Sequence, residues 1–334
     1  MRAYEITSAD GVDALALKER DSVLPGAGEI LVRMRASAIN YRDLSTIEDP
    51  LARSIALPRV PNSDGAGDVV AVGSGVTRFK PGDRVAGCFF QDWSDGGISA
   101  AAMASALGGP IDGVLAENVL LREGGAVSLP DHLSFEEGAT LPCAGLTAWN
   151  CLVEQGGLKA GDTALFLGTG GVSIFGLQFA KMMGARTIVT SSSDAKLERA
   201  ASLGADELIN YREVPDWQIR VLELTDGAGV DITIETGGGG TLEKTLEATR
   251  IGGTVSLIGV LTGGTINPVT VMRKSIRLQG VYVGNRRMFE DMNAALAFNQ
   301  VHPVIDQVFA FEDARVAYHT MRAAVHFGKL VVTI

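Results

Sequence analysis

Hydrophobic and polar positions alternate in two different ways along the chain. Up to about residue 125, short β-rich runs such as "EILVRMRASAI" (29–39) and "DGAGDVVAVG" (64–73) are separated by turn residues. The segment "FKPGDRVAGCFF" (79–90) begins with the Pro-Gly of a turn and continues as a strand-like run. Short runs punctuated by Gly, Pro, Asn and Asp are typical of strands and their turns. The pattern predicts a mainly β domain in this part of the chain.

From Asp162 onward, apolar strand-like runs alternate with stretches of helical spacing. The strand-like runs are "TALFLG" (163–168), "RTIVTS" (186–191), "DELIN" (206–210), "VDITIET" (230–236) and "GTVSLIG" (253–259). Such an alternation predicts βαβ units, whose parallel sheet is covered by helices on both faces. We therefore expect an α/β fold, with a doubly wound parallel sheet formed by residues 125–284. The tail "GKLVVTI" (328–334) is typical of a strand that returns to the first domain, so residues 1–124 and 285–334 are expected to form one domain.

Composition and charge limit the classes of function. At 334 residues the chain is longer than most single hydrophobic cores allow, which agrees with two domains. The formal net charge of −10, with no basic block to offset it, argues against a nucleic-acid partner. No run approaches the roughly 20 apolar residues of a membrane span, and the first residues are charged where a signal peptide is apolar. We expect a cytoplasmic protein without a membrane partner. The three cysteines are too few and too scattered for a disulfide framework.

A glycine cluster follows the first strand-like run of the second pattern. Glycine there permits a tight turn and lets backbone N–H groups approach a pyrophosphate at the following helix N-terminus. Ser173 stands where the third glycine of the dinucleotide-binding pattern is expected. A glycine turn that serves only close packing is the open alternative. The candidate cofactor-binding residues of this turn are Gly168, Thr169, Gly170, Gly171 and Val172.

Hydroxyl groups follow the second strand-like run, where an NAD site carries an acidic residue that binds the ribose hydroxyls. Ser191 and Ser192 can donate to phosphate oxygens, and Lys196 and Arg212 supply positive charge nearby. This set favours NADPH over NADH, although the carboxylate of Asp194 lies close by. In the open alternative, Ser193 or Asp194 only caps the following helix and Lys196 is solvated.

Four segments together resemble the medium-chain dehydrogenase/reductase superfamily. They are "SDGAGDVVAVGSGVTRFKPGDRV" (63–85), "LPCAGLTAWNCL" (141–152), "LKAGDTALFLGTGGVSIFGLQFAKMMGA" (158–185) and "LGADELINYR" (203–212). Within the superfamily the chain is similar to the quinone-oxidoreductase-like, alcohol-dehydrogenase-named branch. The resemblance implies a GroES-like (chaperonin-10-like) catalytic domain, an inserted Rossmann domain and an active site in the cleft. It also implies a homodimer that pairs through "IRLQGVYVG" (276–284).

The zinc enzymes of this superfamily hold their catalytic metal at three positions, which match Asn40, Ser63 and Cys143 here. Only the cysteine is a usual zinc ligand, whereas a catalytic zinc site needs three protein ligands. The segment 89–113 contains no cysteine, so the family's four-cysteine structural lobe is absent too. We expect no zinc. Cys143 itself lies in an apolar stretch that is typical of an inert core thiol.

Without a metal, proton delivery and carbonyl polarisation must come from side chains, the cofactor ribose or water. The first 130 residues contain no histidine to serve as a base for alcohol oxidation. The expected function is therefore an NADPH-dependent, zinc-independent oxidoreductase that transfers hydride to a quinone, enone or carbonyl compound. Two alternatives stay open: a zinc-type alcohol dehydrogenase with a non-standard ligand set, and a non-catalytic, crystallin-like NADPH-binding protein.

The resemblance also implies catalytic residues. Asn40 resembles the asparagine that zinc-free members place beside the nicotinamide, where its amide can donate to a substrate oxygen. Tyr41 is a candidate phenolic donor, although adjacent strand residues point in opposite directions, so only one of the two is expected to face the site. Asp43 and Asp64 match acidic positions near the family's active site. Local turn or cap bonding is the open alternative for both.

Further cofactor contacts are implied at the loops that follow the strands. Lys329 resembles a C-terminal cation that reaches the cofactor phosphates, with a solvated lysine as the open alternative. The remaining candidates are Thr147 at the nicotinamide end and, after the fourth and fifth strands of the parallel sheet, Thr236, Gly237, Gly259 and Val260.

Overall fold

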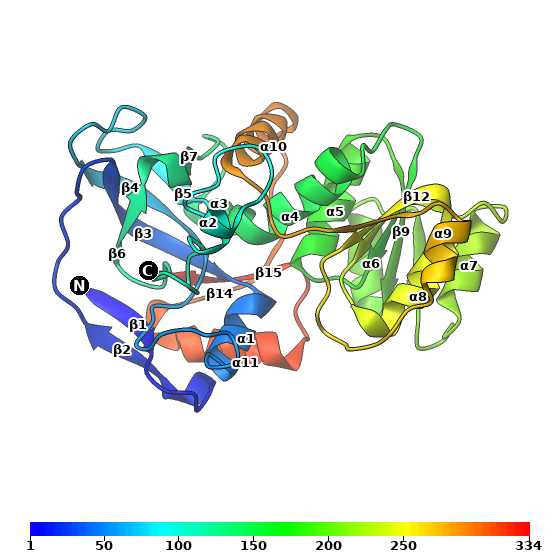
Figure 1. The fold of residues 1–334 in the computed structure, drawn as a ribbon, viewed down its shortest axis with the longest axis horizontal. Helices are drawn as coiled ribbons and strands as arrows, with labels where there is room; N and C mark the ends of the chain where they lie inside the picture. The colour runs from blue at the N-terminus through cyan, green and yellow to red at the C-terminus, as the bar shows by residue number, and fades with distance from the viewer. The chain divides into compact units, whose positions relative to one another are not determined.

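The computed structural model describes residues 1–334 and divides into two compact units (Figure 1). One unit contains residues 1–146 and 283–334, and the other contains residues 147–282. The expected fold class is confirmed, because the first unit is mainly β and the second is a parallel sheet with helices. None of the helices is long and apolar enough to cross a membrane.

The first unit extends beyond the boundary that we expected at residue 125. β7 (Ala126–Ser128) pairs antiparallel with β5 (Arg84–Gly87), and α3 (Phe135–Ala139) packs on the same sheet. Because these elements pair with or pack on the sheet of the first unit, residues 125–146 belong to that unit. Sequence patterning did not show this, since a three-residue strand and a five-residue helix are too short to produce a clear period.

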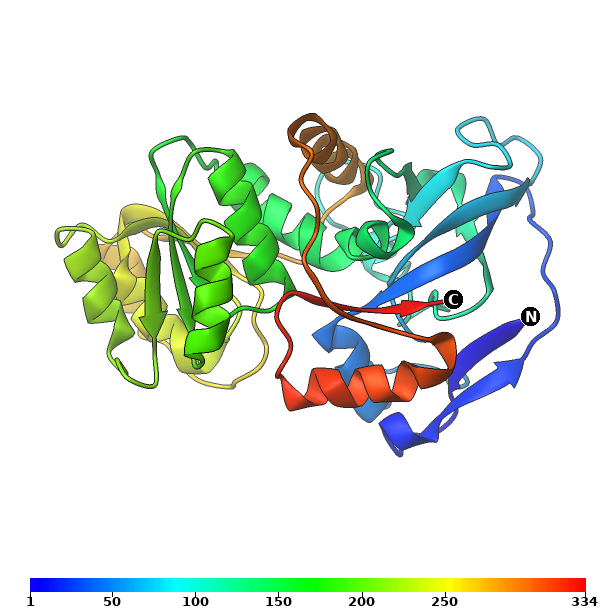
Figure 2. The ribbon, with the colours of Figure 1, turned by 180° about the vertical axis from the view of Figure 1, so that it is seen from behind.

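A seven-stranded sheet forms the first unit, in the order β14-β15-β3-β4-β5-β7, with β6 also paired to β3. The returning tail is confirmed as β15, which runs antiparallel beside β3, as Figure 2 shows for the red strand that ends at the C-terminus. The other strands of this sheet are β3 (Glu29–Ile39), β4 (Asp64–Val72), β6 (Asn118–Arg122), β14 (Ile305–Phe309) and β15 (Lys329–Thr333). A separate two-stranded antiparallel sheet is formed by β1 (Arg2–Ile6) and β2 (Leu15–Glu19).

The longest strand of this sheet, β3, shows why the sequence forms it. Its inward positions Ile30, Val32 and Met34 are at most 1% exposed and alternate with partly exposed residues. Burying each of these side chains contributes about 1.5–3 kcal/mol. The strand ends at Ile39, and α1 (Tyr41–Glu48) begins two residues later. The other helical segments of the unit are η1 (Val12–Ala14), α2 (Ala100–Met103), η2 (Glu123–Gly125), η3 (Leu141–Gly145), α10 (Arg286–Asn299), η5 (Phe311–Asp313) and α11 (Ala314–Ala323).

The second unit is a six-stranded parallel sheet in the order β10-β9-β8-β11-β12-β13. Its chain order reverses beside β8, as in a doubly wound fold. The strands are β8 (Thr163–Leu167), β9 (Arg186–Ser191), β10 (Glu207–Asn210), β11 (Val230–Glu235), β12 (Thr249–Leu257) and β13 (Arg277–Gly280). The helical segments are α4 (Leu146–Trp149), which begins at the boundary, η4 (Asn150–Gln155), α5 (Gly171–Met182), α6 (Asp194–Ser202), α7 (Trp217–Leu224), α8 (Gly239–Ala248) and α9 (Pro268–Arg273).

Candidate active site

The glycine turn between β8 and α5 leaves space for a ligand. Gly168 has φ +74°, which favours glycine, and a Cβ added at Gly168 or Gly170 would meet no atom within 4 Å. Gly170 begins α5 without a side-chain cap, so no side chain there satisfies the first N–H groups of this 12-residue helix. Unsatisfied N–H groups and the helix dipole favour an anion. The turn therefore fits the pyrophosphate of a dinucleotide.

Two residues of α5 replace the missing third glycine: Ser173 occupies its position, and Gly176 makes the close helix–strand contact. Ser173 is buried, and its hydroxyl donates to the Leu167 carbonyl oxygen at 2.7 Å, so the serine side chain is accommodated inside the turn. The close approach of helix to strand occurs instead at Gly176, where a Cβ would come within 2.6 Å of the Phe166 ring. The sequence pattern did not identify Gly176, because the usual spacing places this role three residues earlier.

The predicted 2′-phosphate residues gather at the carboxyl ends of β9 and β10. Ser191 is the register partner of Asn210, so Arg212 lies at the same edge of the sheet as the serines. Arg212 is exposed and forms no ion pair, and Lys196 is half-buried in the first turn of α6. Asp194 accepts a hydrogen bond from Asn210 Nδ2 at 2.7 Å. The neighbouring carboxylate is thus engaged by a neutral amide, while Arg212 has no acidic partner.

Glu235, which sequence reasoning missed, organises the loop after β11. Its buried Oε1 accepts hydrogen bonds from Gly237 N at 2.7 Å, Gly238 N at 3.0 Å and Thr241 Oγ1 at 2.7 Å. Its Oε2 accepts from Thr245 Oγ1. A carboxylate two residues before a run of glycines was the available signal, because loop N–H groups need an acceptor when they are buried.

The remaining cofactor candidates of the second unit are Thr236, Gly259 and Val260, on the loops after β11 and β12, and Thr147 in α4. Thr236 Oγ1 donates to the Leu167 carbonyl oxygen at 2.7 Å, which ties the ends of β11 and β8 together. Gly259 packs against the Thr236 backbone so closely that a Cβ would come within 2.3 Å of it. Val260 is 71% exposed, whereas Thr147 is buried in α4. Their contacts with a cofactor stay predictions.

In the first unit, Asn40 occupies the junction of β3 and α1. It is 7% exposed, its Oδ1 accepts a hydrogen bond from Lys329 Nζ at 2.5 Å, and its Nδ2 has no partner. Lys329 is 3% exposed and also donates to the Ile39 carbonyl oxygen at 2.7 Å. The Lys329 ammonium group is therefore buried and bonded to Asn40, so the alternative of a solvated lysine is wrong.

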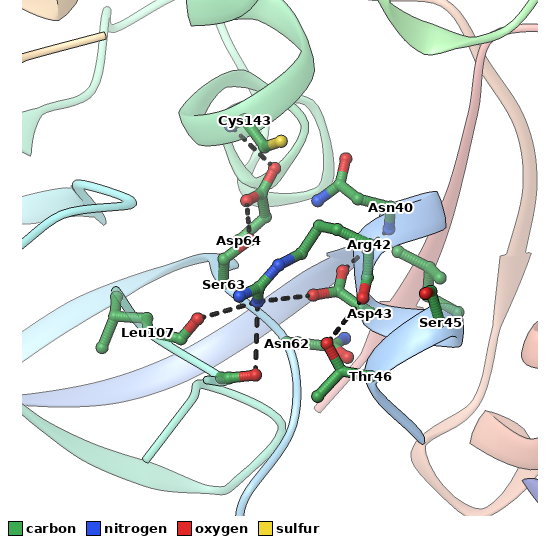
Figure 3. Close-up of polar contacts among 12 residues, drawn as sticks. Asn40, Arg42, Asp43, Ser45, Thr46, Asn62, Ser63, Asp64, Leu107 and Cys143 are labelled. Carbon is green, nitrogen blue, oxygen red and sulfur yellow. Dashed lines mark hydrogen bonds and ion pairs between the residues drawn. The ribbon is translucent and has the colours of Figure 1, made fainter. Parts of the chain in front are cut away.

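Tyr41 and Asp43 follow Asn40 on α1. The strand-alternation argument for Tyr41 is wrong, because β3 has already ended and Tyr41 is the first helical residue, with 46% exposure. Asp43 is fully buried: its Oδ2 accepts from Asn40 N at 2.9 Å, and its Oδ1 pairs with Arg42 at 3.0 Å. Figure 3 shows Arg42 reaching on to the Leu107 carbonyl oxygen, a 2.8 Å bond. These contacts are those of a helix cap.

Asp64, at the start of β4, is the second buried carboxyl group of this site. Its Oδ1 accepts from Ser63 Oγ at 2.6 Å and its Oδ2 accepts from Cys143 N at 3.0 Å (Figure 3). Burial raises the pKa of Asp64 to about 6, against the opposing charge of Lys329. A carboxyl group that titrates near neutral pH is suited to proton transfer.

The three positions that match zinc ligands do not fit a catalytic zinc ion. Ser63 Oγ donates a hydrogen bond to Asp64 Oδ1, and Asn40 Oδ1 already accepts a hydrogen bond from the Lys329 ammonium group. Cys143 is the only usual zinc ligand of the three, and one thiol cannot form the three-ligand site that a catalytic zinc ion needs. The structure contains no group of three or more His, Cys, Asp or Glu side chains arranged to hold a metal ion.

Comparisons with known proteins connect both units to dehydrogenases. Residues 26–131 match the alcohol dehydrogenase GroES-like domain family, and residues 171–298 match the zinc-binding dehydrogenase family. A zinc-type alcohol dehydrogenase-like protein of Schizosaccharomyces pombe is 42% identical over 92% of this chain and 91% of its own length. A quinone oxidoreductase of Pseudomonas aeruginosa is 31% identical over 99% of each chain.

Solved structures agree with the fold over the whole chain. A Sinorhizobium meliloti 1021 protein, described as a candidate alcohol dehydrogenase, has a TM-score of 0.94 and 42% identity, and the match covers 100% of this chain and 98% of that one. A NAD-dependent alcohol dehydrogenase has a TM-score of 0.91 and 32% identity, with 100% of both chains covered. A mycobacterial protein complexed with NADPH has a TM-score of 0.85 and 26% identity, again with 100% of both chains covered.

Proposed function

The chain belongs to the medium-chain dehydrogenase/reductase superfamily, and from this premise we propose that it is an NADPH-dependent oxidoreductase that works without zinc. Its substrate is a quinone, an enone or another carbonyl compound, which accepts hydride from the cofactor. The observation that carries this proposal is the chemistry at Asn40, Ser63 and Cys143. These residues supply a neutral amide, a hydroxyl group and a single thiol where the zinc enzymes hold their metal with three ligands.

NADPH, when bound, supplies the hydride. The chain's own groups bind NADPH and the acceptor, and they hold or deliver the proton that the reduced acceptor gains. The open glycine turn at Gly168 and Gly170 receives the pyrophosphate. Asn40 Nδ2, a donor without a partner, binds the substrate oxygen on which negative charge develops. In a quinone or enone this charge is delocalised, so an amide donor suffices where a simple aldehyde gains more from a metal ion.

The preference for NADPH is supported by the residues at the ends of β9 and β10. Ser191 and Ser192 offer hydroxyl donors, while Lys196 and Arg212 offer positive charge to a 2′-phosphate. The related NAD-dependent alcohol dehydrogenase makes NADH the necessary comparison in any assay.

A second copy of the chain is the partner that we propose, paired through β13. This strand is at the edge of the six-stranded sheet, and three of its four residues are exposed. An uncovered edge presents unpaired N–H and C=O groups, which a symmetry-related strand can satisfy. Analytical ultracentrifugation should give twice the mass of one chain. A proline at exposed Gly280 should lower it toward the monomer, because Val281 N donates to β12 and the N–H of the preceding residue therefore faces the free edge.

Oxidation of NADPH by the purified protein in the presence of a chelator tests the proposed function. The acceptors are a panel of quinones, enones and aldehydes, with NADH as the parallel donor. Turnover that survives chelation and prefers NADPH supports the proposal and identifies the acceptor class. Activity that depends on added zinc indicates a zinc-type dehydrogenase, and tight NADPH binding without turnover indicates a non-catalytic binding protein.

A further inference from the structure

We propose that Lys329 is a positioning residue, whose buried ammonium group holds the Asn40 amide so that Nδ2 is the hydrogen-bond donor offered to the substrate oxygen. This inference rests on the proposed function. It also differs from the role that resemblance implies for Lys329, contact with the cofactor phosphates, so the two roles lead to different results.

The tertiary structure brings Lys329 to Asn40 through strand pairing. β15 runs antiparallel to β3, and Leu330 is the register partner of Ile39. Lys329, the first residue of β15, therefore lies beside the end of β3, although 289 positions separate it from Asn40 in the chain. Its Nζ donates to the Ile39 carbonyl oxygen at 2.7 Å and to Asn40 Oδ1 at 2.5 Å. With 3% exposure and no ion pair, the ammonium depends on these two oxygens.

An ammonium group next to an amide allows only one orientation of that amide. Lysine has three N–H donors and no acceptor, so the Asn40 oxygen must face it and the NH2 group must point away. Rotating the amide by half a turn would place two donors against each other. Figure 3 shows the Asn40 amide nitrogen turned toward Asp64 and Cys143. The Lys329 contact thus determines that the amide nitrogen of Asn40, and not its oxygen, faces Asp64 and Cys143.

The amide nitrogen of Asn40 is the unusual feature that needs explaining. Buried donors are nearly always hydrogen-bonded, because burying one without a partner costs free energy. Asn40 Nδ2 is buried and has no acceptor within hydrogen-bonding distance, although the Asn40 side chain is near enough to Asp64 to lower the pKa of that carboxyl group. It faces the position where zinc enzymes would hold the metal that polarises the substrate oxygen. A donor kept without a partner at that place is explained by a substrate oxygen that becomes its partner.

The backbone of Asn40 is fixed separately from its side chain. Asn40 N donates to Asp43 Oδ2 at 2.9 Å, which sets the position of the main chain at the start of α1. The Lys329 ammonium acts on the amide, whose oxygen also takes part in the capping box with the backbone of Asp43. Removing Lys329 should therefore change the orientation of the amide without moving the helix.

The kinetic test compares Lys329→Met, Asn40→Ala and the double variant. Methionine keeps much of the length of lysine but has no charge and no donor. We expect Lys329→Met to lower kcat about 10- to 100-fold, with the Kd for NADPH, measured by fluorescence titration, within about twofold of wild type. The double variant should be no slower than Asn40→Ala, because Lys329 acts only through Asn40. A tenfold rise in the NADPH Kd, or losses in kcat that multiply in the double variant, would overturn the inference.

A second variant covers the outcome in which Lys329→Met fails to fold. Asn40→Asp keeps an acceptor for Lys329 and gains an ion pair with it, but it loses the donor. We expect this variant to keep the wild-type melting temperature or exceed it, while its kcat falls as far as that of Asn40→Ala. Wild-type kcat in Asn40→Asp would contradict the role of Nδ2.

A readout without turnover separates this inference from the proposed function. The side-chain amide of Asn40 is followed by NMR in protein labelled with ¹⁵N-asparagine and assigned by its loss in Asn40→Ala. We expect Lys329→Met to shift this resonance and speed its hydrogen exchange. If wild type reduces no acceptor, the proposed function fails. If the resonance is the same in Lys329→Met as in wild type, the positioning role fails whether or not the enzyme turns over.

Discussion

The glycine turn after β8 and the Asn40 site after β3 differ in the groups that they offer to a ligand: backbone groups in the turn, and a side-chain amide at Asn40. In the turn, no atom lies within 4 Å of the place where a Cβ of Gly168 or Gly170 would stand, so a ligand can approach the backbone there. At Asn40, side chains from four separate segments meet: Asn40 and Lys329 bond directly, as do Asp64 and the backbone of Cys143.

This difference determines what each site tolerates. A backbone site accepts most side chains that do not enter the ligand space, because its donors are set by the fold. A side-chain network fails when one partner is lost, because a buried group is then left without its hydrogen bond. Glu235 complicates the comparison, since it brings a side-chain network of this second kind into the unit that holds the glycine turn.

The largest effect is expected from Glu235→Ala, which tests whether the loops of the second unit depend on this one side chain. The substitution leaves two backbone and two hydroxyl donors without their acceptor. We expect the free energy of unfolding, measured by urea denaturation, to fall by about 4 kcal/mol. Glu235→Gln, which keeps the shape and one acceptor oxygen, is the matched control and should lose less. A loss under about 1 kcal/mol for Glu235→Ala would show that the backbone holds the loop unaided.

Asp64→Asn tests the side-chain site through its pH dependence. Burial raises the pKa of Asp64 to about 6 from 3.8, an effect that Asp43 increases and Lys329 opposes. The folded state therefore binds the proton more tightly than the unfolded state, and the cost of ionisation is absent below pH 3.8 and complete above pH 6. Between pH 3 and 8, wild type should lose about 3 kcal/mol relative to Asp64→Asn, as measured by urea denaturation at each pH.

The matched asparagine can retain both contacts of Asp64, because its oxygen can accept from Cys143 N and its amide can donate to Ser63 Oγ. A stability difference between wild type and Asp64→Asn that stays constant from pH 3 to 8 would contradict the raised pKa.

Gly170→Asp tests the backbone site. Aspartate is a favourable N-cap residue, and a Cβ at Gly170 meets no atom within 4 Å, so the melting temperature should not fall. The carboxylate repels the cofactor phosphates, so we expect the Kd for NADPH to rise about 100-fold, or about 2.7 kcal/mol. Gly170→Asn is an uncharged control of the same size and should show a smaller rise. Unchanged NADPH affinity in Gly170→Asp would place the pyrophosphate elsewhere.

The smallest effect is expected from Lys196→Ala combined with Arg212→Ala. This double variant tests how much side chains add to the cofactor binding provided by the backbone of the glycine turn. Loss of both cations should weaken NADPH binding about tenfold, or about 1.4 kcal/mol, and leave NADH binding unchanged in fluorescence titrations. Lys181→Ala is the control, because Lys181 pairs with Asp206 and is not among the predicted cofactor contacts. An equal loss for both cofactors would remove the basis for an NADPH preference.

The sequence could predict the features whose cause is local. Apolar runs and helical spacing predicted five of the six strands of the parallel sheet, and resemblance supplied β13. The glycine turn was also identified, because its conformation depends on neighbouring residues such as Gly168, with φ +74°. Even here, tertiary packing moved the close helix–strand contact from the expected third position to Gly176.

By itself, the sequence determined the two patterns of secondary structure, the glycine turn and the replacement of two zinc-ligand residue types. Only the tertiary structure decided that Lys329 faces Asn40, that Asp64 is buried against Cys143 N and that residues 125–146 join the first unit. The physical reason is distance along the chain. Hydrophobic periodicity reports which face of an element is buried, whereas the partner of a polar side chain depends on the register between segments that are remote in sequence.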